Sequence, residues 1–120
     1  MTEHFRAHKV TIDGHLFDSR SEARRYTELC LMRSAGLIGE LQVHPELILI
    51  PAYEGKPAVR YTADFSYMDL EHCVLVTEDV KPFKRNAKGE RVPYLTRDFV
   101  LRWKLAQYNY RARKFEIVEA

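Results

Sequence analysis

Two short segments in the middle of the chain carry residues whose chemistry suits phosphodiester hydrolysis. The first reads Arg-Tyr-Thr-Ala-Asp-Phe-Ser-Tyr and places Asp64 in a predicted strand. The second reads Val-Leu-Val-Thr-Glu-Asp-Val-Lys and places Asp79 two residues before Lys81. Mg²⁺ prefers oxygen ligands and commonly uses one or two carboxylates together with phosphate oxygens of the substrate. Two carboxylates and a lysine at one end of a sheet therefore predict a Mg²⁺-dependent phosphodiesterase, in which Mn²⁺ can replace Mg²⁺.

The alternation of side chains along a strand decides which of these groups can act together. Asp79 and Lys81 share one face of their strand, whereas Glu78 points to the other face. In one register of the predicted hairpin, Asp64 lies opposite Thr77 and diagonal to Asp79 on the same face, at about 7–8 Å between backbones. A register shifted by one residue would instead bring Glu78 onto the face of Asp64. The sequence leaves this choice open.

Neighbouring groups are candidates for the same chemistry. The main-chain carbonyl of Val80 is a further candidate oxygen ligand beside Asp64 and Asp79. Glu22 is a candidate for holding a second ion, or a water that belongs to the first. Lys81, a compact cation, would orient the attacking water or stabilise the charge that grows on the phosphate. Glu22 also has a structural explanation as part of a helix cap, and the two roles are compatible.

Local signals place the elements of the N-terminal half. Residues 9–17 alternate between apolar and polar types around Asp13-Gly14, a pair that favours the two-residue turn of a hairpin. Ser19 and Glu22 have the spacing of a capping box, and Gly36 is a natural helix terminator. We therefore expect a small hairpin followed by a helix.

The remainder of the chain, from residue 41 onward, is predicted to contain most of the sheet. Residues 41–50 indicate a strand with a bulge or an edge at Pro45. The two strands with the acidic residues follow, then a loop over residues 82–95. Thr96 is a candidate cap for a second helix, whose apolar positions Phe99, Trp103, Ala106 and Tyr110 follow helical spacing. Residues 114–119 form the last predicted strand.

Composition bounds the class of protein. The 120 residues, 46% hydrophobic and 30% charged, fit a single domain over residues 1–120. No apolar run approaches the length of about eighteen residues that a membrane helix needs, so we expect a soluble protein without a membrane partner. Two distant cysteines, Cys30 and Cys73, indicate a reducing, cytoplasmic setting. The net charge of +2 alone does not predict a nucleic-acid partner.

The order of these residues resembles the PD-(D/E)XK nuclease superfamily: a helix with Glu22, a strand with Asp64, then a strand with Asp79 and Lys81. The resemblance is closer to a small phage and prophage branch of uncharacterised proteins and covers about residues 9–119. The residues that match the pattern of this branch are Gly14, Phe17, Asp18, Ser19, Glu22, Ala23, Arg25, Tyr26, Gly36, Ile38, Pro45, 63–65 and 78–81.

This resemblance implies a fold, a site and a setting. The fold would be α/β with a restriction-endonuclease-like core, in which two helices flank a central mixed sheet of about four to five strands and a hairpin precedes them. The catalytic residues would be Glu22, Asp64, Asp79 and Lys81. The metal ligands would be Asp64, Asp79, Val80 and Glu22. As a phage or prophage protein, the chain would act in the cytoplasm of a bacterial host.

The chain departs from the pattern of this branch at two positions. His44 stands where the pattern has Gln, and Pro82 stands where a Gly usually follows the lysine. A histidine can keep a polar contact at the first position. Pro82 has no backbone N–H, which excludes a phosphate contact from that amide.

The most basic stretch of the chain directly follows Lys81, in the predicted loop over residues 82–95. Its cations, with two more on the second helix, are candidate contacts to DNA phosphates, although a merely solvated loop has the same composition. These candidates are Lys84, Arg85, Lys88, Arg91, Arg97 and Lys104. A domain of this size offers little surface for a duplex, so a homodimer with two sites is a further hypothesis.

Two functions of different classes fit these residues. The first is a metal-dependent DNA endonuclease without an organic cofactor, with branched or recombining DNA as one candidate substrate. The second is a non-catalytic DNA-binding or assembly module on the same fold. A lysine beside two acids favours the enzyme, because a module released from catalysis has no physical reason to keep it. A ribonuclease would use the same chemistry, but nothing in the sequence reads a 2′-hydroxyl.

Overall fold

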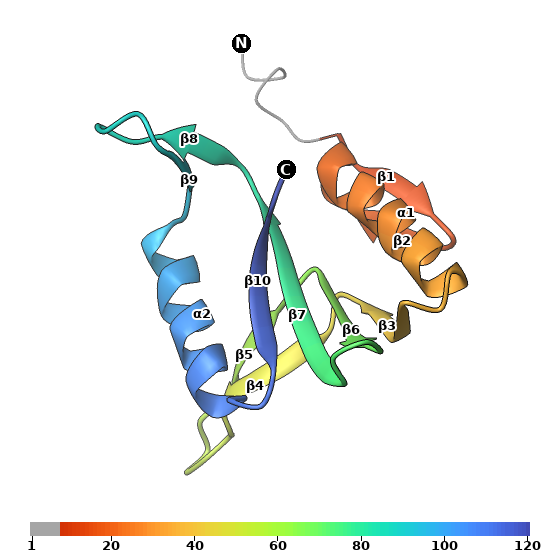
Figure 1. Ribbon diagram of the computed structural model, residues 1–120. Helices are drawn as coiled ribbons and strands as arrows, with labels where there is room; N and C mark the ends of the chain where they lie inside the picture. Colours follow the sequence, from red (N-terminus) through yellow and green to blue (C-terminus); the bar gives the residue numbers. More distant parts are fainter. Residues whose placement is uncertain (1–7) are drawn as a thin grey trace.

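A four-stranded mixed sheet with a helix on each side forms the centre of the molecule (Figure 1). The structure is a computed structural model and describes residues 8–120. Its elements are β1 (Val10–Ile12), β2 (His15–Phe17), α1 (Arg20–Ser34), β3 (Ile38–Val43), β4 (Glu46–Ile50), β5 (Val59–Thr62), β6 (Phe65–Asp69), β7 (Val74–Lys81), β8 (Phe83–Arg85), β9 (Arg91–Pro93), α2 (Arg97–Asn109) and β10 (Lys114–Glu119). The predicted α/β class, with two helices and a mixed central sheet, is confirmed.

The sheet has the order β10-β7-β6-β3, with β10 parallel to β7 and the other pairs antiparallel. Phe65 pairs with Glu78, so the next position of the ladder sets Asp64 opposite Asp79. This register differs by two residues from the one in which Asp64 faces Thr77. Because side chains alternate with a period of two, a shift of two leaves Asp64 and Asp79 on the same face.

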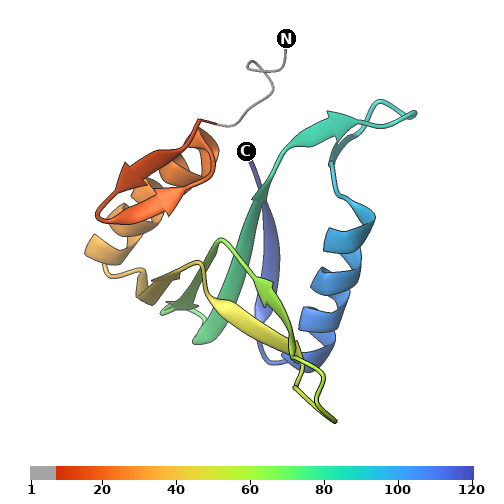
Figure 2. The same cartoon turned by 180° about the vertical axis from the view of Figure 1, so that it is seen from behind.

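Two predicted strands are each divided in two at the same level, one of them beside Pro45, where a bulge or an edge was expected. The break between β3 and β4 is at His44, and the break between β5 and β6 is at Asp64, which therefore lies in a bend rather than in the centre of a strand. The amide of His44 donates to the carbonyl of Asp64 at 2.9 Å, and the amide of Ala63 donates to the carbonyl of Pro45 at 3.0 Å. These bonds keep the strands paired while the β4–β5 ribbon turns away toward α2 (Figure 2).

The N-terminal elements pack on one side of the sheet. The predicted hairpin around Asp13-Gly14 is confirmed, and Ser19 caps α1 by accepting a hydrogen bond from the amide of Glu22 at 3.2 Å. The reciprocal bond of a capping box is replaced, because the Glu22 carboxylate accepts from the amide of Asp18 at 3.0 Å. The buried core between α1, the hairpin and the sheet contains Phe17, Ala23, Tyr26, Leu29, Ile38, Phe65, Tyr67 and Val76.

The second core lies between α2, the β4–β5 ribbon and β10. Thr96 caps α2 through the amide of Phe99, and the predicted apolar positions of this helix face the core. The core contains Leu47, Leu49, Tyr61, Ala63, Phe99, Trp103 and Ala106. Residues 82–95 differ from the predicted loop, because β8 and β9 pair within them as a short hairpin beyond the end of β7.

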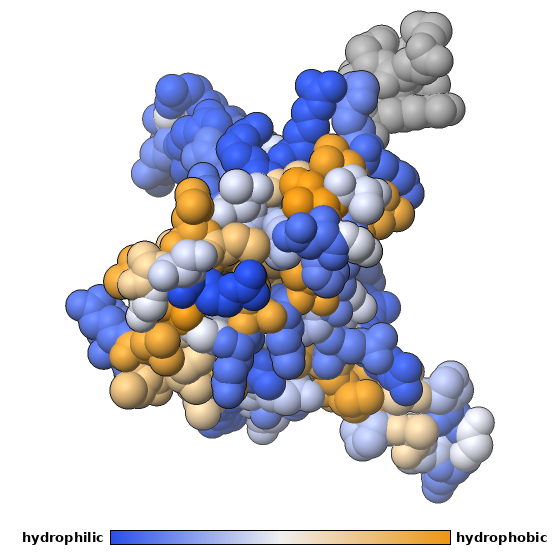
Figure 3. Space-filling model, turned by 90° about the vertical axis from the view of Figure 1, so that its right-hand side faces the viewer, coloured by the Kyte–Doolittle hydropathy of each residue, from blue (hydrophilic) through white to orange (hydrophobic). Residues whose placement is uncertain are grey.

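The surface is mixed in character. On the face drawn in Figure 3, hydrophobic residues form separate patches among hydrophilic ones. Across residues 8–120, neither helix has the length and apolar character that a membrane span requires.

Candidate functional site

The predicted catalytic residues lie in two neighbouring pairs, Glu22 with Asp64 and Asp79 with Lys81. Glu22 is delivered by the first turn of α1, Asp64 by the bend before β6, and both Asp79 and Lys81 by the end of β7. The Nζ atom of Lys81 lies 3.6 Å from Oδ1 of Asp79, which confirms that these two side chains share a face. Glu22 and Asp79 are buried, at 8% and 3% exposure. Burying like charges this closely is costly unless a cation or protons compensate them.

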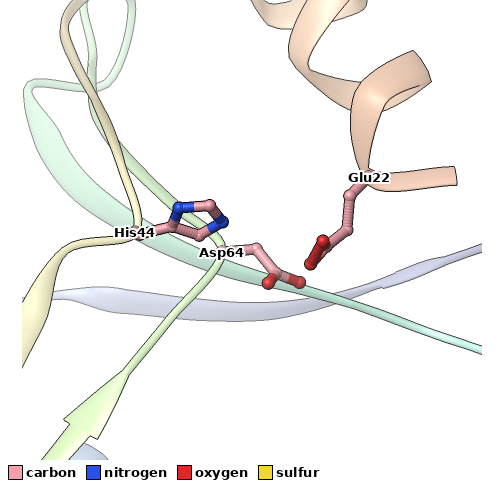
Figure 4. Close-up of side chains that lie close together, drawn as sticks. All are labelled: Glu22, His44 and Asp64. Carbon is pink, nitrogen blue, oxygen red and sulfur yellow. The ribbon is translucent and has the colours of Figure 1, made fainter. Parts of the chain in front are cut away.

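In two of the carboxylates, one oxygen accepts a hydrogen bond from a backbone amide. Val80 donates its N–H to Oδ2 of Asp64 at 2.7 Å, and Asp18 donates its N–H to Oε2 of Glu22 at 3.0 Å. Fixed partners of this kind orient a carboxylate toward a cation. In Figure 4 the Glu22 side chain descends from α1 with its carboxylate facing that of Asp64. The amide of Val80 thus belongs to the site, whereas its predicted role as a carbonyl ligand stays a prediction.

His44 is a member of the site to which the sequence assigned no role. One potential ligand atom from each of Glu22, His44 and Asp64 lies within 4.8 Å of the others. The imidazole extends from the junction of β3 and β4 toward the two carboxylates (Figure 4). Its separation from Asp64 by twenty residues hides this proximity in the sequence, and only the Gln position of the resembling pattern singled it out.

The electrostatics of the site favour the protonated forms of two acids when no cation is bound. The pKa of Asp64 is raised to about 8, first by burial and then by its contact with the Glu22 carboxyl, against the opposing effects of the Val80 amide and Lys81. The pKa of Asp79 is raised to about 7 by burial, although Lys81 opposes the rise. A divalent cation would displace these protons, because it stabilises the ionised carboxylates.

Asp79 supplies a direct test of whether a cation fits this site. Its Oδ2 atom is buried and has no hydrogen-bond partner among residues 8–120. A buried carboxylate oxygen without a partner is unfavourable and calls for an ion, a water or a proton as its partner. Oxygens of Glu22 and Asp64 lie within 4.8 Å of each other and of a ring nitrogen of His44, whereas Asp79 is not part of this close group. The residues present therefore fit a divalent cation.

Glu78, the other acid of the same strand segment, has a different environment. It is fully buried on the α1 side, where Arg25 donates to both carboxylate oxygens at 2.9 and 2.6 Å and the Tyr67 hydroxyl donates to one of them. This separation confirms that Glu78 and Asp79 point to opposite faces. Because Arg25 lies on α1 one turn after Glu22, its ion pair also ties the helix to β7.

The predicted phosphate contacts lie on two elements. The β8–β9 hairpin carries Lys84, Arg85, Lys88 and Arg91. Arg85 donates to the carbonyl of Gly89 at 2.8 Å, and Arg91 is paired with Glu119. Arg97 and Lys104 stand on α2, where they border a shallow pocket with the apolar residues Leu95, Val100 and Leu101. The structure places these six cations outside the acidic cluster.

Comparison with known proteins gives one match. A family model described as "Protein of unknown function (DUF1064)" matches residues 2–119. No curated protein and no solved structure matches the chain.

Proposed function

This chain belongs to the DUF1064 family, and from the geometry of its site we propose that it is a Mg²⁺-dependent endonuclease that hydrolyses DNA phosphodiester bonds. The observation that carries the proposal is the placement of Glu22 and Asp64 within reach of one cation, with Asp79 and Lys81 paired at the neighbouring end of β7. A fold does not gather three acids and a lysine in this way for stability, because the desolvation of each charge is unfavourable. Such perturbed clusters are typical of functional sites.

The acids are the groups that would hold the ion. Glu22 and Asp64, whose oxygens lie within 4.8 Å of each other, would bind it together with Asp79, and the Val80 carbonyl is a fourth candidate. Bound Mg²⁺ would stabilise negative charge on the phosphate and favour ionisation of water at neutral pH. The amides of Val80 and Asp18 keep two of the carboxylates in place, so little reorganisation is needed when the substrate arrives.

Lys81 is placed to act on the substrate itself. Its ammonium group lies 3.6 Å from Asp79 and 4.2 Å from the centre of the Phe99 ring, which together limit its position. A positive charge fixed beside the acids would attract the phosphate and stabilise the charge that develops on it. The carboxylate of Asp79 that faces this ammonium group would hold it in orientation.

The neighbouring basic residues support DNA as the substrate. The β8–β9 hairpin continues from Lys81 through Pro82 and carries four cations, so a polyanion bound at the site would pass beside them. Contacts to phosphates position a nucleic acid without reading its sequence. We accordingly propose that the hairpin and the two cations of α2 grip the backbone, with branched DNA among the candidate substrates.

The order of these residues along the chain also supports a more specific fold type. We propose that the core is of the PD-(D/E)XK type, because an acid on the first helix, an acid in the bend before β6 and an Asp-x-Lys on β7 occur in that order. Its placement in phage or prophage genomes and in the bacterial cytoplasm is part of the same proposal. A homodimer, which would present two sites to two strands, is tested by light scattering at micromolar concentration with and without DNA.

The decisive experiment compares the wild type with Asp79→Ala on labelled linear, nicked, flapped and four-way DNA, with Mg²⁺ or Mn²⁺. We expect the wild type to cleave at least one substrate and the variant to lose about a thousandfold or more of the rate, because a proposed ligand of the ion is removed. EDTA should abolish the wild-type activity. Asp98→Asn, an exposed acid on α2 paired with Arg102, is the matched control and should cleave normally.

Two outcomes would contradict the proposal. Cleavage that survives both Asp79→Ala and EDTA would show that another site or a contaminant is responsible. Inactivity of both proteins, combined with DNA binding that neither the substitution nor EDTA changes, would instead identify a non-catalytic DNA-binding or assembly module.

A further inference from the structure

We propose that His44 is a nitrogen ligand in a cation subsite formed with Glu22 and Asp64, and that this subsite selects a first-row transition-metal dication such as Mn²⁺ over Mg²⁺. The inference deepens the proposed function and rests on it, because it concerns which ion the same site takes. It adds a residue that the acidic cluster alone does not include.

Geometry brings the imidazole to the ion site. Ligand atoms of Glu22, His44 and Asp64 lie within 4.8 Å of one another, a separation that one cation can span. Figure 4 shows the ring of His44 directed from its strand junction toward the two carboxylates. The ring also packs against Phe17, with 5.8 Å between the ring centroids, which restricts its motion.

The backbone of His44 is constrained by its conformation and by a hydrogen bond. Its φ angle of 54° lies in the left-handed region, which residues other than glycine adopt at a cost. Its amide is bonded to the carbonyl of Asp64, so the histidine and the aspartate are fixed to each other across the two breaks of the sheet. Such strained positions cluster at functional sites, where the surrounding structure holds them.

A second observation points independently to a bound ion. Asp79 is 3% exposed, and within residues 8–120 its Oδ2 atom finds no partner although it lies in the same cluster of charges as Glu22. This buried, uncompensated oxygen adjoins the group of Glu22, His44 and Asp64 without belonging to it. A cation in that group would also offset the negative charge of Asp79.

The donor chemistry decides the class of ion. Mg²⁺ binds oxygen, holds its waters tightly and gains little from imidazole. First-row transition dications bind imidazole and carboxylate together, and their affinities exceed that of Mg²⁺ at mixed sites. A glutamine at position 44, as in the resembling pattern, would offer an amide oxygen and remove this preference.

The test measures ion binding by the whole protein without DNA. Mn²⁺ and Mg²⁺ titrations by calorimetry give both affinities for the wild type and for His44→Gln. We expect the variant to bind Mn²⁺ at least tenfold more weakly, while its affinity for Mg²⁺ stays within about threefold. Pulsed electron paramagnetic resonance of the Mn²⁺ complex should show coupling to ¹⁴N in the wild type and none in His44→Gln.

Matched controls make the result specific. His72→Gln removes an imidazole from an exposed turn, where it pairs with Asp69, and should keep both the affinity and the ¹⁴N coupling of the wild type. Thermal unfolding of each metal-free variant establishes that it is folded.

The outcomes separate this inference from the proposed function. Absence of ¹⁴N coupling in the wild type, or equal Mn²⁺ affinities of wild type and His44→Gln, would overturn the role of His44 and leave an all-oxygen nuclease site intact. Failure of the wild type to bind either ion would overturn both proposals.

Discussion

Glu78 and Asp79 are adjacent buried acids on one strand, yet their surroundings differ in every respect. Glu78 receives two hydrogen bonds from Arg25 and one from Tyr67, so its charge is fully compensated. Asp79 has only the Lys81 ammonium group at 3.6 Å, and one of its oxygens has no partner within residues 8–120. The two faces of β7 thus carry one satisfied acid and one unsatisfied acid.

The difference separates a structural acid from a functional one. A buried carboxylate with complete partners holds elements together, and here it ties α1 to the sheet. A buried carboxylate that lacks partners can still bind an ion or a substrate. It lowers the stability of the protein when that ligand is not bound. Sequence distance is no guide to this distinction, because a single peptide unit separates the two.

The largest expected effect comes from removing the ion-pair partner of Glu78. Arg25→Met should lower the free energy of unfolding by about 3–5 kcal/mol, because it leaves the Glu78 carboxylate buried without its cation. Urea denaturation at pH 7 measures this loss. The double variant Arg25→Met with Glu78→Gln should recover much of it, since no charge then remains unpaired and the amide can still accept from Tyr67. A double variant as unstable as the single one would contradict this account.

The next effect has the opposite sign and depends on pH. The pKa of Asp79 is about 7 in the folded protein against an ordinary value of 3.8, so the folded state binds the extra proton between these values. Its contribution to stability is therefore complete below about pH 4 and is lost as the pH rises through 7. Asp79→Asn should stabilise the metal-free protein at pH 8 by on the order of 2–4 kcal/mol relative to wild type.

Urea denaturation of both proteins at pH 5 and pH 8 checks this prediction. The stability of Asp79→Asn should change less with pH than that of the wild type, while Asp64, whose pKa is about 8, contributes the same trend in both proteins. A variant that is less stable than the wild type at pH 8 would show that Asp79 is compensated in a way that the structure does not contain.

Ion binding should stabilise the protein by compensating the charge of Asp79, and it should not affect Glu78. At a Mg²⁺ concentration ten times its dissociation constant, the wild type should gain about 1.4 kcal/mol in free energy of unfolding. Asp79→Asn should gain much less at the same concentration, because a ligand oxygen has lost its charge. Equal gains in thermal or urea denaturation would place the ion elsewhere.

The smallest effect concerns Lys81. Lys81→Met should cost less than about 1 kcal/mol of stability, because its ion pair with Asp79 is partly exposed and loose compared with that of Arg25. The pKa of Asp79 should rise above about 7 in this variant, since Lys81 lowers it. Carboxyl NMR titration measures the shift, and an unchanged pKa would separate Lys81 from the site.

Elements with strong local signals were predictable from the sequence. The hairpin at Asp13-Gly14, the cap at Ser19, the helix after Thr96 and the strands of residues 74–81 and 114–119 are all confirmed. Turn residues, caps and apolar periodicity act over a few positions, so they can be recognised without knowledge of the tertiary contacts. The shared face of Asp79 and Lys81 follows from the same local rule and is confirmed.

Features that need two distant segments were not predictable in this way. The loop expected over residues 82–95 pairs as β8 and β9, and the register of β6 with β7 differs by two residues from the one considered. The bends at His44 and Asp64 arise where the sheet divides between two cores. Pro45 signalled the first of them in the sequence, whereas the bend at Asp64 has no local signature. The partner of Glu78 lies 53 residues away on α1.

The sequence by itself therefore determined which residues carry reactive groups, and which of them share a strand face, because alternation along a strand is a local property. Only the tertiary structure decided which acid is compensated. The approach of α1 gives Arg25 to Glu78 and Glu22 to the cluster, and the paired breaks of the sheet bring His44 beside Asp64. These contacts depend on where the hydrophobic cores place each element, and that placement is a property of the whole chain.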